Sequence, residues 1–72
     1  MDPIEVARLQ KYFRTKFGMP SVSVRPRSKK ADSAEVYIGD EFLGVIFKDD
    51  EDGGVSYDFN MAILEEDLPE RD

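Results

Sequence analysis

Residues 2–17 alternate hydrophobic and polar positions with the period of an α-helix. The start of this segment is well marked, because Asp2 is a favoured N-cap residue and Glu5, three positions later, completes a capping box. Its end is marked by Gly18, a common helix stop, and by Pro20, which cannot continue a helix. The pattern therefore predicts a helix over 2–17 whose buried stripe consists of Val6, Leu9, Phe13 and Phe17.

After residue 20 the period changes to the alternation that is typical of β-strands. Four segments show it: 21–26, 33–38, 41–47 and 55–61. Gly39-Asp40 is a two-residue hairpin signal between the second and third segments. Residues 27–32 are polar and predict a loop, while Pro26 limits the first strand and suits a sheet edge. The simplest arrangement is an α+β fold in the order αββββ, with one N-terminal helix packed on one face of a three- to four-stranded antiparallel meander.

The hairpin turn also predicts which side chains share a face of the sheet. A two-residue turn places Tyr37 opposite Phe42 and Val36 opposite Leu43, and cross-strand partners share a face. A β-bulge at Gly44 would change this register and turn Ile46 towards the helix. In the register without a bulge, three apolar side chains point away from the helix: Tyr37, Phe42 and Ile46.

The apolar face formed by Tyr37, Phe42 and Ile46 is the first candidate for function. Two aromatic rings and an isoleucine can expose a few hundred Å², the size at which a patch on a monomer usually has a binding role. Three interpretations are open at this point. The face can bind a partner protein or a second copy of the chain, it can stack on a base or small ligand, or the segment 62–68 can cover it with Ile63, Leu64 and Leu68.

Charge is distributed unevenly along the chain, whose net charge is −6. Residues 1–30 carry eight basic and two acidic side chains, whereas residues 31–72 carry two basic and fourteen acidic ones. The net charge disfavours non-specific nucleic-acid binding, but forked arginine donors fit phosphate well. The basic residues therefore form either a solvated surface or, as the alternative function, an RNA-binding surface: Arg8, Lys11, Arg14, Arg25, Arg27, Lys29 and Lys30.

Composition argues against several classes of site. The chain has no Cys and no His, which removes disulfides, the ordinary zinc and haem sites, the commonest general base and the commonest nucleophilic thiol. Asp50, Asp52 and Gly53 resemble a fragment of a calcium loop, but Lys48 and Phe59 stand where such a loop needs carboxylates. We therefore predict a protein that is not an enzyme and that has no catalytic residues, no metal and no cofactor.

The length of 72 residues predicts one domain over 1–68, with 69–72 as a disordered acidic tail. No apolar run approaches the roughly 20 residues that a membrane-spanning helix needs. The first residues also lack the basic and apolar regions of a signal peptide. We expect a cytoplasmic protein, away from membranes, whose partner is an unidentified protein or a second copy of itself.

Two segments resemble a known family. They are VYIGDEFLGV at 36–45 and SYDFNMAIL at 56–64, and the segments 21–30 and 49–53 fit the same family. The chain resembles a family of short alphaproteobacterial proteins that are catalogued only as a domain of unknown function. The resemblance covers nearly the whole chain, and it implies no activity because the family has none to transfer.

Overall fold

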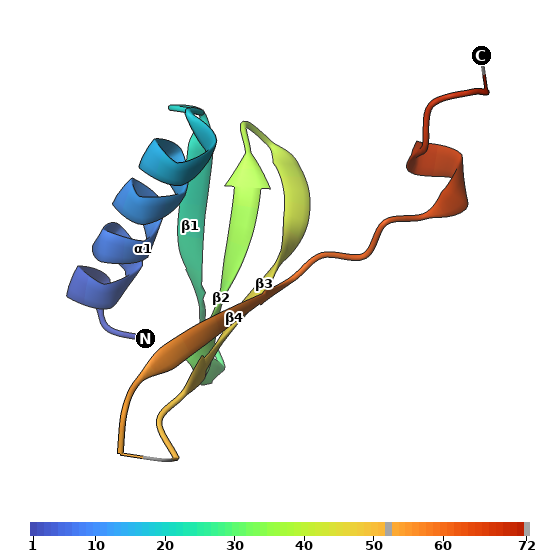
Figure 1. Ribbon diagram of the computed structural model, residues 1–72. Coiled ribbons are helices and arrows are strands. Elements are labelled where there is room, and N and C mark those ends of the chain that lie inside the picture. Colours follow the sequence, from blue (N-terminus) through green and yellow to red (C-terminus); the bar gives the residue numbers. More distant parts are fainter. Residues whose placement is uncertain (52, 72) are drawn as a thin grey trace.

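The computed structural model describes residues 1–51 and 53–71, and the elements in this part of the chain follow the predicted order (Figure 1). The strands form one antiparallel sheet in the order β1-β2-β3-β4, and α1 lies on one of its faces. The predicted α+β architecture is therefore confirmed. The elements are α1 (Pro3–Phe17), β1 (Val22–Arg27), β2 (Lys30–Ile38), β3 (Glu41–Asp49), β4 (Ser56–Asn60) and the 3-10 helix η1 (Glu65–Asp67).

Both ends of α1 are capped as the sequence predicts. The Asp2 carboxylate accepts the Glu5 main-chain N–H at 2.7 Å, and the Glu5 carboxylate accepts the Asp2 N–H at 3.3 Å. At the other end Gly18 has a φ of 63°, in the left-handed region that favours glycine, and its N–H bonds to the Arg14 carbonyl. These two caps fix where the helix begins and ends.

The hydrophobic core lies between α1 and the sheet. Of the predicted helix stripe, Leu9 and Phe13 are buried and Val6 packs half-buried against them. Phe17 stacks on Phe13, with 5.6 Å between ring centroids, but stays 55 % exposed at the edge of the core. The stripe is therefore buried along its middle and open at its last turn. The buried apolar side chains of the sheet are Val22, Val24, Ala34, Val36 and Ile46.

The predicted register between β2 and β3 is correct only next to the turn. Tyr37 pairs with Phe42 as expected, but a β-bulge then pairs Val36 with Gly44 instead of Leu43. Ile46 consequently faces α1 and is 0 % exposed, so the prediction that it lies on the opposite face is wrong.

Close packing against β4 explains why glycine occupies position 44, next to the bulged Leu43. A Cβ at position 44 would lie 2.9 Å from the Phe59 ring, and closer still to the main-chain oxygen of Asn60. No side chain fits this space, so Gly44 lets β3 and the end of β4 approach each other.

The predicted loop over 27–32 is also wrong, because most of it is strand. β1 extends to Arg27 and β2 begins at Lys30, which leaves a tight turn of two residues. The pairing slips after Pro26, and Arg27 then lies opposite Lys30. A polar sequence is compatible with strand here because a solvent-exposed hairpin needs no hydrophobic side chains.

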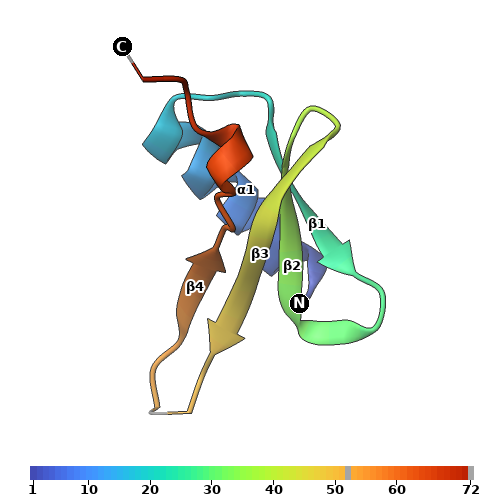
Figure 2. The same ribbon diagram turned by 90° about the vertical axis from the view of Figure 1, so that its right-hand side faces the viewer.

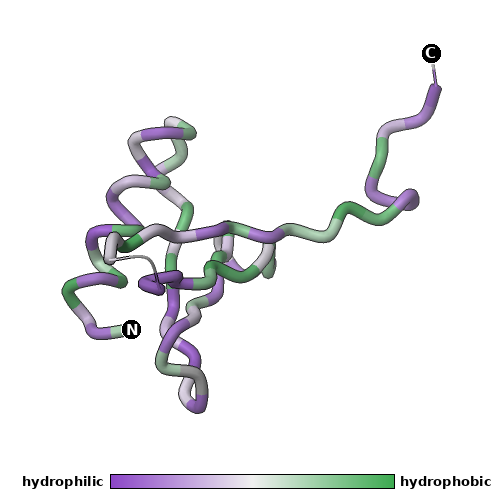
Figure 3. Tube along the Cα trace, turned by 60° about the horizontal axis from the view of Figure 1, so that its bottom comes forward, coloured by the Kyte–Doolittle hydropathy of each residue, from purple (hydrophilic) through white to green (hydrophobic). Residues whose placement is uncertain are grey.

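Residues 61–71 leave the end of β4 and project away from the sheet, on the side opposite α1 (Figures 1 and 2). The apolar residues of this segment form the hydrophobic stretch visible in Figure 3, and η1 is the short helical turn of the chain here. The interpretation in which these residues fold back over the sheet is therefore wrong for this structure. Their exposed fractions are 48 % for Met61, 66 % for Ile63, 54 % for Leu64 and 57 % for Leu68.

Candidate functional site

The sheet face opposite α1 is the candidate functional site, and we call it the open face. Strand alternation and the cross-strand pairs place these side chains together. β3 supplies an apolar centre in which Phe42 is 51 % and Phe47 is 44 % exposed. The open face consists of Ser23, Arg25, Arg27, Glu35, Tyr37, Phe42, Val45, Phe47, Asp58 and Asn60, together with Ser33, which is buried beneath its neighbours.

Tyr37 is held on the open face by contacts on several sides. The Arg25 guanidinium lies over its ring at 3.9 Å from the centroid, and the Phe42 ring meets it edge-on at 5.6 Å. The Tyr37 hydroxyl donates to the Glu35 carboxylate at 3.0 Å, and this hydrogen bond raises the pKa of Tyr37. Arg25 also donates to the Gly39 carbonyl at 3.2 Å. These contacts within the chain hold the ring in a defined position.

The two edges of the open face carry opposite charges. On β1, Arg25 covers Tyr37, and the Arg27 Nε lies 3.8 Å from the Glu35 carboxylate. On β4, Asp58 is exposed, and it lines a hollow together with further carboxylates of the β3–β4 hairpin. The face thus changes from basic at β1, through apolar at β3, to acidic at β4. The hairpin carboxylates are Asp49, Asp50 and Glu51.

A groove separates the open face from the projecting segment. Its volume is about 740 Å³, and its walls are β3 on one side and the residues after β4 on the other. Phe42, Val45 and Phe47 line the sheet wall, and Met61 and Leu64 line the opposite wall. The apolar surface of β3 therefore continues into the apolar part of the projecting segment.

The structure places two of the three residues predicted for the interaction face together. Tyr37 and Phe42 are in contact on the open face, whereas Ile46 lies in the core on the other side of the sheet. Sequence reasoning missed Val45 and Phe47, which take the place that Ile46 was predicted to occupy. The signal for them was Gly44, the position of the bulge that reverses the faces of the rest of β3.

The residues predicted for phosphate binding are divided between the two sides of the sheet. Arg8 and Lys11 are exposed on α1, and the Arg14 Nε donates to the Val22 carbonyl at 2.7 Å, which ties the helix to β1. Arg25 and Arg27 belong to the open face instead. Lys29 is exposed in the β1–β2 turn, and the side chain of Lys30 lies outside the described residues. Phosphate binding at these residues stays a prediction.

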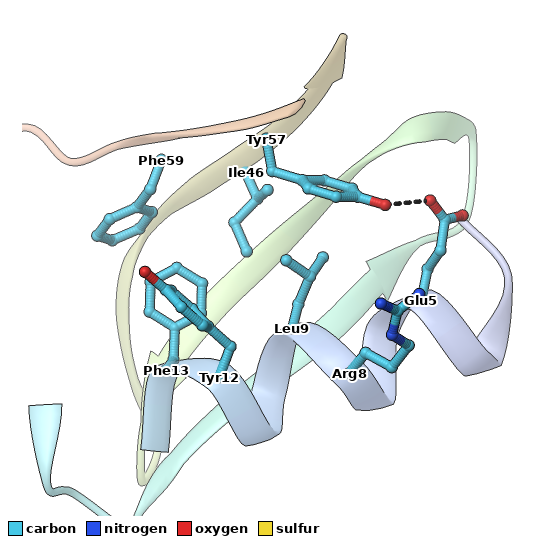
Figure 4. A pocket seen from close by; sticks show the side chains of 8 residues that line it. All are labelled: Glu5, Arg8, Leu9, Tyr12, Phe13, Ile46, Tyr57 and Phe59. Carbon is cyan, nitrogen blue, oxygen red and sulfur yellow. Dashed lines mark hydrogen bonds between the residues drawn. The ribbon is translucent and has the colours of Figure 1, made fainter. Parts of the chain in front are cut away.

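A second cavity lies between α1 and β4, and no local pattern in the chain predicts it (Figure 4). Its volume is about 350 Å³, and Leu9 and Phe13 form its floor with residues of β3 and β4. At one end the Glu5 carboxylate accepts the Tyr57 hydroxyl at 2.6 Å and pairs with the Lys48 Nζ at 2.7 Å. These contacts join α1 to β3 and β4, so the polar groups at this end of the cavity have a structural role.

We expect the contact between α1 and β4 to weaken in acid. The Lys48 ammonium and the Tyr57 hydroxyl lower the pKa of Glu5 from 4.5 to about 2. A carboxylate with a lowered folded-state pKa stabilises the fold above its unfolded pKa, and this stabilisation is lost as the pH falls towards the folded value. Urea unfolding should therefore show wild type more stable than Glu5→Gln at neutral pH. The difference should shrink between pH 4.5 and about 2, and a difference that is constant with pH would contradict this assignment.

Neither a metal-binding cluster nor a membrane-spanning helix occurs in the described part of the chain. Within residues 1–51 and 53–71, no three acidic side chains are arranged to hold a metal ion. Asp52, which belongs to the resemblance to a calcium loop, lies outside these residues. None of the helices described has the length and apolar character needed to cross a bilayer.

Comparison with known proteins gives one match. The model of a family described as "Protein of unknown function (DUF3126)" matches residues 5–67, which run from the first turn of α1 to the end of η1. No curated protein and no solved structure matches the chain. The match covers far more than half of the chain, and it confirms the resemblance to a domain of unknown function. The chain therefore belongs to the family of proteins of unknown function DUF3126.

Proposed function

We propose that this protein is a non-catalytic protein-interaction module that binds its partner through the open face. The observation that carries the proposal is the exposed apolar centre of that face. Phe42 and Phe47 are 51 % and 44 % exposed, next to a Tyr37 ring that is already fixed. An aromatic centre with charged residues around it is the usual composition of a protein-binding surface.

The charges of the open face favour a protein over a nucleic acid as its binding partner. Both arginines of this face are engaged within the chain, Arg25 with Tyr37 and Arg27 with Glu35. Asp58 and the carboxylates of the β3–β4 hairpin would repel a phosphate backbone that crossed the sheet. A protein partner can instead present both signs of charge to the two edges.

The polar groups of the open face support a binding role rather than a catalytic one. The Tyr37 hydroxyl is bonded to Glu35, and Glu35 also lies beside Arg27. A catalytic base or nucleophile needs a free lone pair directed at a substrate. The groove beside β3 is lined mainly by apolar side chains.

Site-specific photo-cross-linking in cells that express the protein tests the proposal. A photoreactive phenylalanine analogue replaces Phe47 in one variant, and in the control it replaces Ile4, which is 72 % exposed on α1. We expect a discrete cross-linked protein from position 47 and none from position 4, with the cross-linked protein identified by mass spectrometry. Equal cross-linking from both positions, or none from position 47, would contradict the proposal.

A further inference from the structure

We infer that the cavity between α1 and β4 binds a small aromatic carboxylate, with its ring among the aromatic side chains of the cavity and its carboxylate at Arg8 (Figure 4). The cavity lies on the α1 side of the sheet and the open face on the other, so this inference does not depend on the proposed function. Its volume of about 350 Å³ is within the range of roughly 300–1,000 Å³ that is typical of small-molecule sites. Such sites combine apolar walls with a few polar groups, and the cavity has both.

The walls of the cavity are largely aromatic. The Phe13 ring meets the Phe59 ring edge-on at 5.3 Å between centroids, and the Tyr12 ring edge-on at 5.9 Å. Tyr12 is 57 % and Tyr57 is 36 % exposed, so part of each ring is open to a ligand. Aromatic rings pack favourably against one another in edge-on or offset arrangements. The rings of α1 and β4 around one cavity therefore favour an aromatic ligand over an aliphatic one.

The charge at the polar end of the cavity favours an anion. The Glu5 carboxylate there accepts the Tyr57 hydroxyl at 2.6 Å and pairs with the Lys48 Nζ at 2.7 Å, so its charge is compensated. Arg8 lines the same end, and neither ion pair found within residues 1–51 and 53–71 includes it. Two cations and one carboxylate leave this end net positive. The exposed Arg8 guanidinium has the forked donors that fit a carboxylate.

The electrostatics of Tyr57 agree with this placement of Arg8. The hydrogen bond to Glu5 and burial raise the pKa of Tyr57, whereas the charges of Lys48 and Arg8 act to lower it. The positive potential of Arg8 therefore extends to the Tyr57 hydroxyl, at the polar end of the cavity.

The helix determines the separation between the charge and the nearest ring of α1. Glu5, Arg8, Leu9 and Tyr12 have the i, i+3, i+4, i+7 spacing of one helix face, and all four line the cavity. Arg8 and Tyr12 are about one turn apart, which is about 6 Å along the axis for four residues. A short alkyl linker between a carboxylate and an aromatic ring spans a similar distance. A ligand whose carboxylate binds Arg8 would therefore bring its ring to Tyr12 and Phe13.

Amide chemical shifts of the whole isotope-labelled chain test the class of ligand in a titration. The probe is indole-3-propionate, which joins an aromatic ring to a carboxylate through a short linker. We expect shifts that cluster at residues 5–13 and 57–59, and a dissociation constant of about 1 mM or lower for a ligand of this size. The controls are indole-3-propionamide, which lacks the charge, tryptamine, which has the opposite charge, and octanoate, which lacks the ring. Each control should bind at least about fivefold more weakly.

A pair of variants tests the role of Arg8. Arg8→Gln should lower the affinity for indole-3-propionate at least about fivefold and leave the affinity for indole-3-propionamide unchanged. Lys11→Gln is the matched control, because Lys11 is exposed on α1 but does not line the cavity. It removes the same charge from the chain and should bind the probe as wild type does. Circular dichroism of both variants ensures that a loss of binding is not a loss of fold.

Four results would overturn the inference. The first is a probe that shifts no amide around the cavity at concentrations up to about 10 mM. The second is equal binding of indole-3-propionate and any of the three controls. The third is an equal loss of affinity in Arg8→Gln and Lys11→Gln, which would indicate a general charge effect. The fourth is a set of shifts centred on Phe42 and Phe47, which would place the ligand on the open face.

Discussion

Gly44→Ala should strongly destabilise this protein, although it adds only one methyl group. Its new methyl group would lie 2.9 Å from the Phe59 ring and closer still to the Asn60 main-chain oxygen, so β3 and β4 would have to separate. Overpacking a tight site costs about 1–3 kcal/mol, and a clash with main chain lies at the upper end. A chain of 72 residues has roughly 4–11 kcal/mol of stability, so much of it would be lost. Urea unfolding followed by circular dichroism measures the change.

Gly54→Ala is the matched control for this substitution. A Cβ at Gly54 meets nothing within 4 Å, and the same methyl group therefore has room there. We expect its unfolding midpoint to stay close to wild type or to rise slightly, since alanine restricts the unfolded chain. Equal midpoints for the two variants would show that the close approach at Gly44 is absent in solution.

Ile46→Ala should cost about 2–5 kcal/mol, because it removes a fully buried side chain from the core. The bulge at Gly44 is the reason, since without it the residue would lie on the exposed side of the sheet. The free energy of unfolding from urea titration is the measurement. The substitution therefore tests the register of β3 directly.

Ile63→Ala is the control of the same residue type. Ile63 is 66 % exposed in the projecting segment, so its truncation should change the free energy of unfolding by less than about 0.5 kcal/mol. A small effect at both positions would mean that Ile46 is not in the core. The measurement is made at low protein concentration, where self-association does not add to the stability.

The sequence was sufficient for those parts of the fold that local physical chemistry determines. The Asp2–Glu5 capping box and the left-handed Gly18 both act within one turn of α1, and both were predictable. The Gly39-Asp40 turn likewise determined the first pairs between β2 and β3. Each of these features depends on residues that lie a few positions apart, so the pattern alone contains them.

The faces of β3 depend on contacts that local pattern does not contain. Gly44, next to the bulge, packs against Asn60 and Phe59, which belong to a strand about fifteen residues later. The alternation in 41–47 suits either register, since apolar residues occupy both faces of this strand. Because the predicted register had no bulge, it assigned Ile46 to the candidate site in place of Val45 and Phe47. The cavity beside Tyr57 was missed for the same reason, because Glu5 and Tyr57 are 52 positions apart.

The strand order also determines how the chain reaches this structure. Every pair of neighbouring strands is a hairpin of consecutive segments, and α1 packs chiefly on β1, the segment that follows it. Contacts so close in sequence cost little loop entropy, which is typical of domains that fold in milliseconds or faster. Contacts of α1 with the later strands are more distant in sequence, and they include the Phe13–Phe59 ring contact and the Glu5–Tyr57 hydrogen bond with β4. The topology therefore predicts that β4 closes onto α1 late in folding and that this contact is among the first to open.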